Sequence, residues 1–179
     1  MKGIVFVEFL EMIEEEFGLE TVQSIIDGCD LDSNGIYTSV GTYSHKEFFE
    51  ILDKISELKG IEKDKILISF GKYFLTVASK SYPDFFKTNN VFEFLQSIDN
   101  YIHPNVLKLY PEAELPRFEH VQINSNQMKL RYFSSRKMSK FAEGLIVEAG
   151  KYFNQELNVV EEKYLKDGEE VLLNITYAE

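Results

Sequence analysis

Apolar residues recur at steps of three and four through much of the first two-thirds of the chain, the spacing that gives an α-helix one core-facing side. The clearest run, Val5–Phe17, stops at Gly18, a residue typical of helix ends. Ser44 precedes another run and has Glu47 three residues later, which predicts a helix with a capping box that closes at Gly60. The pattern therefore predicts an N-terminal helical part with helices at 5–17, 21–28, 45–59, 66–77 and 92–109.

The spacing changes to strand-like segments after Pro111. Asn124-Ser125-Asn126 and Lys166-Asp167-Gly168 each separate two such segments, which predicts two β-hairpins. A helical stretch lies between the hairpins, so we expect an α+β fold in which helices precede a four-stranded antiparallel sheet with an inserted helix. Without a repeat or a Pro/Gly-rich linker, residues 1–179 are expected to form a single domain. The predicted elements are strands at 118–123, 127–133, 157–164 and 171–177 and a helix at 137–153.

Composition then limits the classes of function. Hydrophobic residues make up 44% of the 179 residues, with 15 Phe and 10 Tyr, which supports a folded core and excludes intrinsic disorder. A formal net charge of −11 argues against nucleic acid or an anionic membrane surface as the main partner. Because we find neither a signal peptide nor a membrane-spanning segment, we expect a soluble, cytoplasmic protein.

Signatures of enzyme and metal chemistry are weak. The single cysteine, Cys29, excludes a disulfide framework and a Cys-based zinc cluster, and the acidic residues around it disfavour a reactive thiolate. The sequence contains no G-x-S-x-G, H-E-x-x-H, Walker A or G-x-G-x-x-G motif. Asp30–Gly35 imitates the first half of an EF-hand loop, but the position of its bidentate Glu is Gly41. We therefore expect neither an enzyme nor a calcium site.

The three histidines differ in their surroundings. His45 and His120 lie among polar or alternating residues and are expected at the surface. His103 lies in a segment rich in Phe, Leu and Ile, where a histidine is either a satisfied core residue or a metal ligand. Pro104 follows it directly, so we expect a local break in the helix and a bias of His103 away from right-handed helical angles.

A second group of polar side chains lies in residues 131–136. Side chains two apart on a strand share a face, so Tyr132, Ser134 and Arg136 are expected to present a phenol, a hydroxyl and a guanidinium together. This donor set suits a ligand with two carboxylates, and a neutral imidazole at His103 could hold the metal of the same flat, apolar cofactor. The alternative, a half-exposed strand with polar residues facing water, stays open on these residues alone.

At these residues the sequence resembles the haem nitric oxide/oxygen-binding (H-NOX) family, whose sensor domain also occurs in soluble guanylate cyclase. The resemblance covers nearly the whole chain. His103 matches the position of the family's proximal haem ligand, and Tyr132, Ser134 and Arg136 match its Tyr-x-Ser-x-Arg motif. Further similarity lies at Met1–Gly3, Leu115-Pro116-Arg117 and the segment from Lys137-Met138 to Gly144-Leu145.

The resemblance implies one non-covalent haem b per chain, buried between the helical part and the sheet. His103 would be the axial iron ligand, Pro116 would press on the porphyrin, and Tyr132, Ser134 and Arg136 would bind the propionates.

The resemblance also implies which gas is bound. Oxygen-binding relatives carry a Tyr five residues after the Arg of the motif, where this chain has Phe141. Positions that support the distal hydrogen-bond network in those relatives are Phe9 and Phe74 here, and Val5 and Leu145 complete an apolar pocket. Iron-bound O₂ depends on a distal hydrogen-bond donor far more than iron-bound NO does. The resemblance therefore implies a sensor that binds nitric oxide and also CO, and excludes O₂.

As a stand-alone bacterial sensor of this type, the protein would signal through release of His103 by the iron and relaxation of the haem and its helix. The implied partner is a sensor histidine kinase or a cyclic-di-GMP-metabolising enzyme, and the chain itself would not be an enzyme. Two alternatives stay open. One is an oxygen-binding haem sensor, and the other is a haem-free interaction module whose Tyr/Ser/Arg face captures a carboxylate ligand or a peptide.

Overall fold

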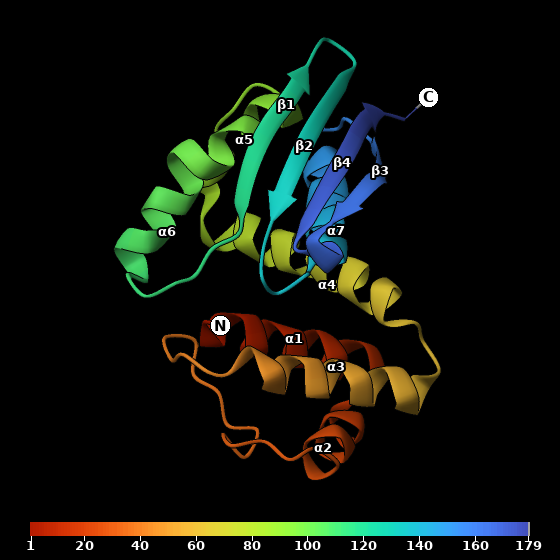
Figure 1. The fold of residues 1–179 in the computed structure, drawn as a ribbon. Coiled ribbons are helices and arrows are strands. Elements are labelled where there is room, and N and C mark those ends of the chain that lie inside the picture. Colours follow the sequence, from red (N-terminus) through yellow and green to blue (C-terminus); the bar gives the residue numbers. More distant parts are fainter. Residues whose placement is uncertain (179) are drawn as a thin grey trace. The chain divides into compact units, whose positions relative to one another are not determined.

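The computed structural model describes the backbone of residues 1–178 and the side chains of all of these except residues 121–123 and 163–164. The chain divides into two compact units, Met1–Phe70 and Gly71–Glu179, and Figure 1 shows the order of their elements. The boundary falls within helix α4 (Lys63–Ser81), so its first turns belong to one unit and the rest to the other. Within residues 1–178, no helix is both long enough and apolar enough to cross a membrane.

The first unit is helical, as the hydrophobic spacing predicts. It contains α1 (Gly3–Phe17), α2 (Leu19–Asp27), α3 (His45–Lys59) and the start of α4. The predicted helix ends at Gly18 and Gly60 are confirmed, and both glycines have positive φ, 83° and 66°, which a residue without a Cβ adopts at little cost. Aromatic and aliphatic side chains from these helices form the core: Phe6, Phe9, Met12, Ile13, Ile25, Phe48, Ile51, Leu52 and Ile55.

Glu47 anchors the loop between α2 and α3. Ser44 caps α3 as expected, accepting from the Lys46 backbone N–H at 3.3 Å. The expected capping box is wrong, because the buried Glu47 carboxylate instead accepts from the Tyr37 hydroxyl at 2.9 Å and from the Ser33 hydroxyl. Burial raises the pKa of Tyr37, so this phenol stays protonated and keeps donating to Glu47. A carboxylate that could cap the helix therefore holds the loop in place.

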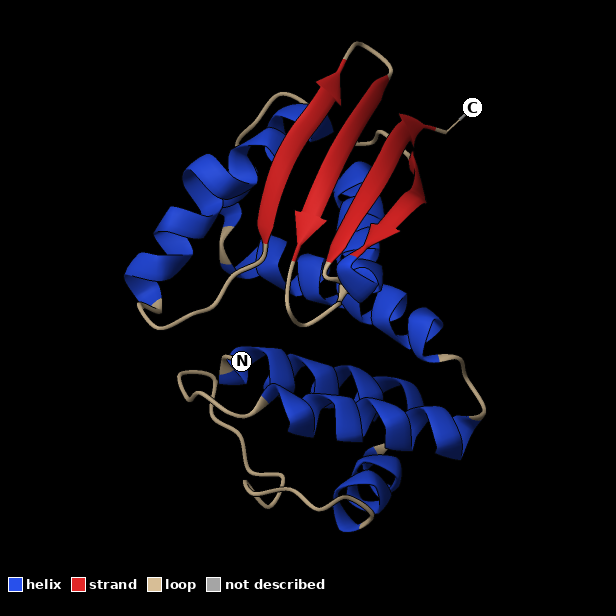
Figure 2. Cartoon of the chain, viewed as in Figure 1, coloured by secondary structure: helices blue, strands red, loops and turns tan. Residues whose placement is uncertain are grey.

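The second unit is an antiparallel sheet with helices, and Figure 2 shows the strands in red. The sheet order is β1-β2-β4-β3, and all neighbouring strands are antiparallel. The predicted α+β fold is confirmed, with helices first and one helix between the two hairpins. The elements are η1 (Pro83–Phe86), α5 (Val91–Ser97), η2 (Ile98–Ile102), α6 (His103–Leu109), β1 (Arg117–Ile123), β2 (Gln127–Phe133), α7 (Ser139–Tyr152), β3 (Leu157–Leu165), η3 (Lys166–Gly168) and β4 (Glu170–Tyr177).

Alternation along β2 and β4 builds the core of this unit. On β2 every second residue is buried, which puts Tyr132 in the core at the end of the strand. Its neighbours across the sheet are Phe118 on β1 and Val171 on β4. Burying one aliphatic side chain such as Val171 stabilises the folded state by about 1.5–3 kcal/mol. A shift of one residue in the strand pairing would turn these side chains toward solvent, so their burial determines the register of the strands. The buried residues of the two strands are Met128, Leu130, Tyr132, Val171, Leu173 and Ile175.

Candidate functional site

His103 is the first residue of α6 and directly follows η2, a single π-helical turn. The His103 backbone N–H bonds to the carbonyl of Ile98, five residues earlier. The interruption expected near Pro104 is therefore present as a π turn. The expected shift of His103 out of the helical region is wrong, because its φ and ψ are −58° and −43°. The wider turn accommodates a proline that has no N–H, and such turns are frequent at functional sites.

The imidazole of His103 is oriented by a carboxylate. Its Nδ1 lies 2.8 Å from Oδ1 of Asp99, and 17% of the His103 side chain is exposed. The other oxygen of Asp99 accepts from the Phe118 backbone N–H at 2.7 Å, which ties the carboxylate to β1. Burial lowers the pKa of His103, with Asp99 opposing the shift, so the imidazole is neutral at physiological pH. A proton on Nδ1 facing Asp99 leaves the lone pair of Nε2 for a metal.

Aromatic rings connect His103 to the second group of predicted residues. The Phe118 ring centroid lies 6.0 Å from that of His103 and 5.6 Å from that of Tyr132. Only 2% of Tyr132 is exposed. Burial raises the pKa of Tyr132, while hydrogen bonds involving Ser134 and the Met138 backbone act in the opposite direction. The phenol therefore remains a hydrogen-bond donor at neutral pH.

Ser134 and Arg136 lie in a turn, not on the strand that was expected to align them with Tyr132. β2 ends at Phe133, and residues 134–138 lead into α7. The Ser134 hydroxyl accepts from the Arg136 backbone N–H at 3.2 Å, and the Ser134 N–H donates to the Glu169 carbonyl at 2.9 Å. The alternation argument is therefore wrong beyond Phe133, because a hydrogen-bonded turn positions these two residues.

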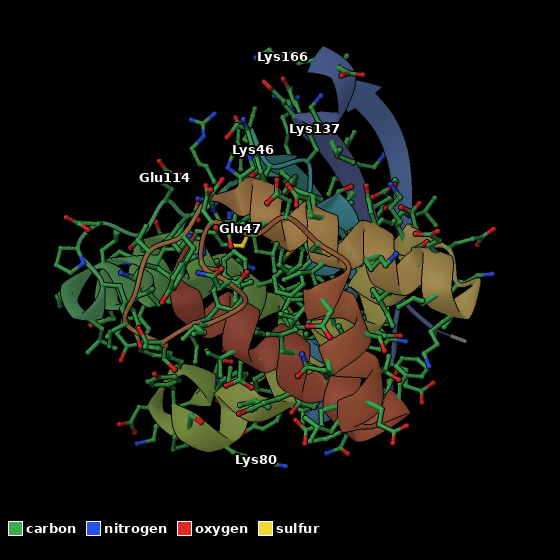
Figure 3. The ribbon with its side chains drawn as sticks, turned by 90° about the horizontal axis from the view of Figure 1, so that it is seen from below. Lys46, Glu47, Lys80, Glu114, Lys137 and Lys166 are labelled. Atoms are coloured by element: carbon green, nitrogen blue, oxygen red, sulfur yellow. The ribbon has the colours of Figure 1, made fainter. Side chains whose placement is uncertain are left out.

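Arg136 joins this turn to the linker that follows α6. Its Nη1 donates to the main-chain carbonyl of Glu114 at 2.7 Å, and its Nη2 donates to the Glu114 carboxylate at 2.6 Å. The Arg136 side chain is 13% exposed, whereas that of Glu114, which Figure 3 labels, is 82% exposed. Pro116 lies two residues further along the same linker, half-buried and just before β1. One guanidinium therefore contacts the segment between α6, which carries His103, and the sheet.

The five residues predicted for the distal pocket are distributed over both units. Val5 and Phe9 lie on α1 in the first unit, where Phe9 is fully buried. Phe74 on α4 belongs to the second unit, as do Phe141 and Leu145 on α7, and all three are half-buried. The rings of Phe74 and Phe141 contact each other with centroids 5.7 Å apart. The distal role of these five residues stays a prediction.

Sequence reasoning missed two residues that contact the predicted site residues, and it gave the wrong environment for one further histidine. Asp99 lies four residues before His103, a spacing that puts two side chains on one helical face and could have signalled the contact. Glu114 offers no such signal, because its contact with Arg136 spans 22 residues. His45 is exposed as expected, but the expectation for His120 is wrong. His120 shares a face of β1 with Phe118, and its Nε2 is buried.

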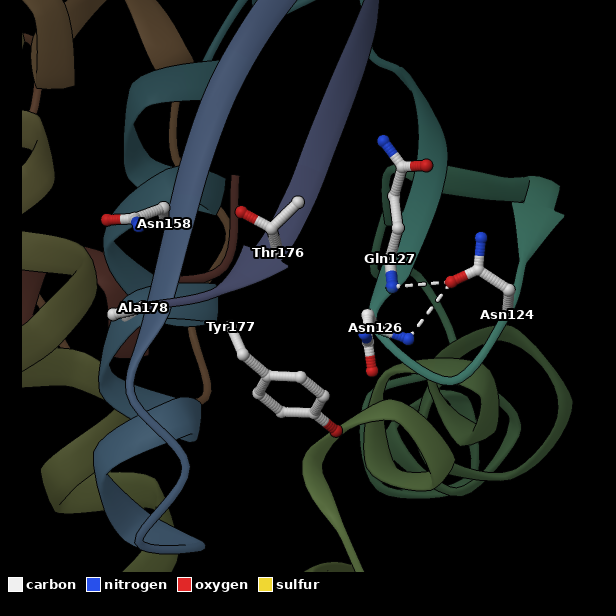
Figure 4. A pocket seen from close by; sticks show the side chains of 7 residues that line it. All are labelled: Asn124, Asn126, Gln127, Asn158, Thr176, Tyr177 and Ala178. Carbon is white, nitrogen blue, oxygen red and sulfur yellow. Dashed lines mark hydrogen bonds between the residues drawn. The ribbon is translucent and has the colours of Figure 1, made fainter.

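A separate hollow lies where the β1–β2 turn meets the end of β4 and the start of β3 (Figure 4). Asn124 uses its side-chain oxygen to accept from the backbone N–H groups of Asn126 and Gln127, each at 2.9 Å. None of the described residues that line the hollow carries a charge or an imidazole, so it offers neither an axial metal ligand nor a charged partner for carboxylates. The lining residues are Asn124, Asn126, Gln127, Asn158, Thr176, Tyr177 and Ala178.

The fold and these side chains define a class of protein. An α+β unit presents a neutral, carboxylate-oriented imidazole together with a phenol, a hydroxyl and a guanidinium. That chemistry fits a cofactor that carries both a metal and carboxylates, as haem does.

Comparison with known proteins identifies the family. The model of the Haem-NO-binding family matches residues 2–161, so the chain belongs to this family and has the fold of a haem-binding gas sensor. The unliganded Fe(II) H-NOX protein from K. algicida is 39% identical, with a TM-score of 0.95 over 100% of this chain and 97% of that one. The comparison with curated proteins gave no match.

Two further solved structures are similar to this chain. The IWP-051-bound H-NOX from Shewanella woodyi in the Fe(II)CO state is 36% identical, with a TM-score of 0.84 over 99% of this chain and 95% of that one. The S. oneidensis H-NOX in the Fe(II)NO state is 24% identical, with a TM-score of 0.91 over the whole of both chains. At 24% identity, the comparison with the S. oneidensis protein shows a shared fold and nothing further.

Proposed function

We propose that this protein is a nitric oxide sensor that holds one haem b without a covalent bond, binds NO and CO, excludes O₂ and acts without enzymatic activity of its own. The observation that carries the proposal is the contact between His103 Nδ1 and Asp99, which directs Nε2 toward a metal. Haem, when bound, supplies the iron at which the gas binds. Membership of the Haem-NO-binding family supports NO as a ligand, and the 36%-identical H-NOX in its Fe(II)CO state supports CO.

The propionates are the proposed ligands of Tyr132, Ser134 and Arg136. The raised pKa of Tyr132 keeps its proton in place for donation to a carboxylate. Arg136 has five N–H donors; one is bonded to the main-chain carbonyl of Glu114 and one to its exposed carboxylate, so a further carboxylate can bind the remaining donors or replace the carboxylate of Glu114.

Exclusion of O₂ is assigned to the apolar character of Phe74 and Phe141. Neither ring carries an O–H or N–H group, and the two rings contact each other edge to face. O₂ bound at a haem here would need a hydrogen-bond donor to stabilise it, which these rings cannot supply, whereas NO would need one far less. The same reasoning applies to Val5, Phe9 and Leu145, the other predicted distal residues.

Signalling is proposed to pass through α6 to a separate partner, a sensor histidine kinase or a cyclic-di-GMP-metabolising enzyme. His103 begins α6 immediately after the π turn of η2, and the linker after α6 is held by Arg136. A gas that changes the strength of the bond between His103 and the iron would favour one of two positions of α6. We propose that α6 changes position by a change in backbone conformation at the π turn, which is wound more widely than an α-helix.

Absorption spectra of the reduced protein test the proposal. We expect a Soret band without added gas, a shift of that band with NO and with CO, and no stable oxygenated spectrum in air. A stable oxygenated spectrum would support the oxygen-sensor alternative. A folded, colourless protein that takes up no added haem would support the carboxylate- or peptide-binding module.

Asp99→Asn is expected to lower haem affinity about 10–100-fold, the range that loss of an outer-shell partner of a metal-bound histidine costs. The amide is a weaker acceptor for Nδ1–H, so Nε2 becomes a weaker donor to iron. Haem titration of the apoprotein measures the affinity, and resonance Raman spectroscopy should show a lower iron–histidine stretching frequency. Asp84→Asn, at an exposed carboxylate paired with Lys87, is the control. Equal frequencies in the variant and the wild type would contradict the orienting role.

Phe141→Tyr is expected to admit some O₂ binding. One hydrogen bond to a charged group contributes about 1.5–3 kcal/mol, so O₂ affinity should rise roughly 10–150-fold if the new hydroxyl reaches the bound gas. Oxygen titration of the reduced protein measures this affinity. Phe49→Tyr adds the same hydroxyl to α3 in the first unit and should leave O₂ binding unchanged.

A further inference from the structure

We propose that Glu114 tunes how tightly the protein holds its cofactor, by competing with the cofactor's carboxylate for the guanidinium of Arg136. The inference rests on the proposed haem function and deepens it, because it assigns a role to a residue outside the Tyr-x-Ser-x-Arg motif.

The two partners of the Arg136–Glu114 ion pair differ in burial. Arg136 is largely buried, with 13% of its side chain exposed, and the Ser134 turn holds its backbone. The Glu114 side chain is 82% exposed and can turn into water with little loss. When a second carboxylate approaches, the guanidinium therefore stays in position and the Glu114 carboxylate is the group that gives way.

The negative charge of Glu114 weakens the attraction of Arg136 for another carboxylate. The Glu114 carboxylate, 2.6 Å from Nη2, already neutralises the single positive charge of Arg136. A cofactor carboxylate that reaches this guanidinium meets a neutral pair and an adjacent negative charge, so its net attraction is smaller than toward Arg136 alone. Removing the charge of Glu114 should therefore tighten binding of a carboxylate-bearing cofactor.

Other cations close in sequence are occupied elsewhere. Lys137, next to Arg136, has its Nζ 2.5 Å from an Asp167 carboxylate oxygen. The Arg117 guanidinium, three residues after Glu114, lies over the Phe133 ring at 4.3 Å. Neither contact involves Glu114, so its effect is expected to act through Arg136.

The charge of Glu114 can be removed without breaking its backbone contact with Arg136. Arg136 also donates to the main-chain carbonyl of Glu114 at 2.7 Å, and this bond does not depend on the side chain. Glu114→Gln therefore keeps the attachment of the linker to the turn and removes only the charge. The linker after α6 stays held to Arg136 whether or not the Glu114 carboxylate is displaced.

The experiment measures the rate at which haem leaves the ferric form of the 179-residue chain when excess apomyoglobin is added. Glu114→Gln should slow haem loss about 2–5-fold at low ionic strength, the size of effect that an exposed ion pair produces. The difference should shrink at 1 M salt, where the Debye length is about 3 Å. Glu112→Gln, an exposed carboxylate on the same linker, should leave the rate unchanged. Urea unfolding of each apoprotein checks that the variants remain folded.

Haem dimethyl ester supplies the decisive comparison, because it has the same iron and ring but no free carboxylate. Glu114→Gln should not change the dissociation rate of the ester. Equal rates for haem in Glu114→Gln and wild type would overturn the inference while leaving the proposed function intact. Equal slowing of haem and its ester would also overturn it, since the effect would not involve a carboxylate. If neither protein takes up haem, the proposed function fails and the inference fails with it.

Discussion

His103→Gly should lower haem affinity by more than the roughly 10–100-fold that loss of an outer-shell partner costs, because it removes the proposed iron ligand itself. The glycine leaves a space beside Asp99 and Phe118, which contact the imidazole. Added imidazole is expected to enter that space, engage Asp99 through one nitrogen and restore the spectrum of the wild-type protein.

Absorption spectra of the reduced variant, recorded with and without imidazole, measure the loss and its rescue. His45→Gly is the matched control, since this histidine is exposed at the start of α3 and should leave the spectrum unchanged. A His103→Gly spectrum identical to that of the wild type would show that another residue binds the iron.

Arg136→Ala is the second large expected effect. It removes a largely buried guanidinium that bonds to the linker and, as proposed, to a propionate. A hydrogen bond to a charged group contributes about 1.5–3 kcal/mol, so haem affinity should fall roughly 10–150-fold. Arg136→Lys should recover only part of this loss, because an ammonium keeps the charge but not the planar fork that binds two oxygens.

Haem titration of the apoproteins measures both variants. Arg131→Ala is the control, because its side chain is 36% exposed and its ion pairs with Glu119 and Glu170, among the residues that the structure describes, are long, at 3.4 and 3.5 Å. Should Arg136→Ala bind haem as tightly as Arg131→Ala does, the propionate assignment would be wrong.

The local pattern of apolar, polar and glycine residues predicted the helices and strands of this fold well. The helix ends at Gly18 and Gly60 depend on backbone angles that favour glycine, and the alternation in residues 127–133 depends on which face of a strand meets the core. Both signals lie within a few residues of the positions they determine, so a single sequence carries them.

The same reasoning failed where a distant group competed with a local one. Glu47 stands at the correct spacing for a capping box, yet it binds Ser33 and Tyr37, because a buried carboxylate is most stable where several donors reach it. Ser134 and Arg136 stand at strand spacing, yet a turn begins after Phe133, where the Ser134 N–H donates to the carbonyl of the distant Glu169.

The sequence by itself determined the succession of helices and strands, because hydrophobic periodicity is a local property of the chain, and its resemblance to a family predicted the residues proposed to hold a haem. Only the tertiary structure decided how those residues are used. The contact of Asp99 with Phe118 and the attachment of Arg136 to Glu114 join residues 19 and 22 positions apart. Such contacts exist only after packing of the core has brought η2, β1, the linker after α6 and the turn after β2 together, because residues this far apart in the chain meet only through tertiary structure.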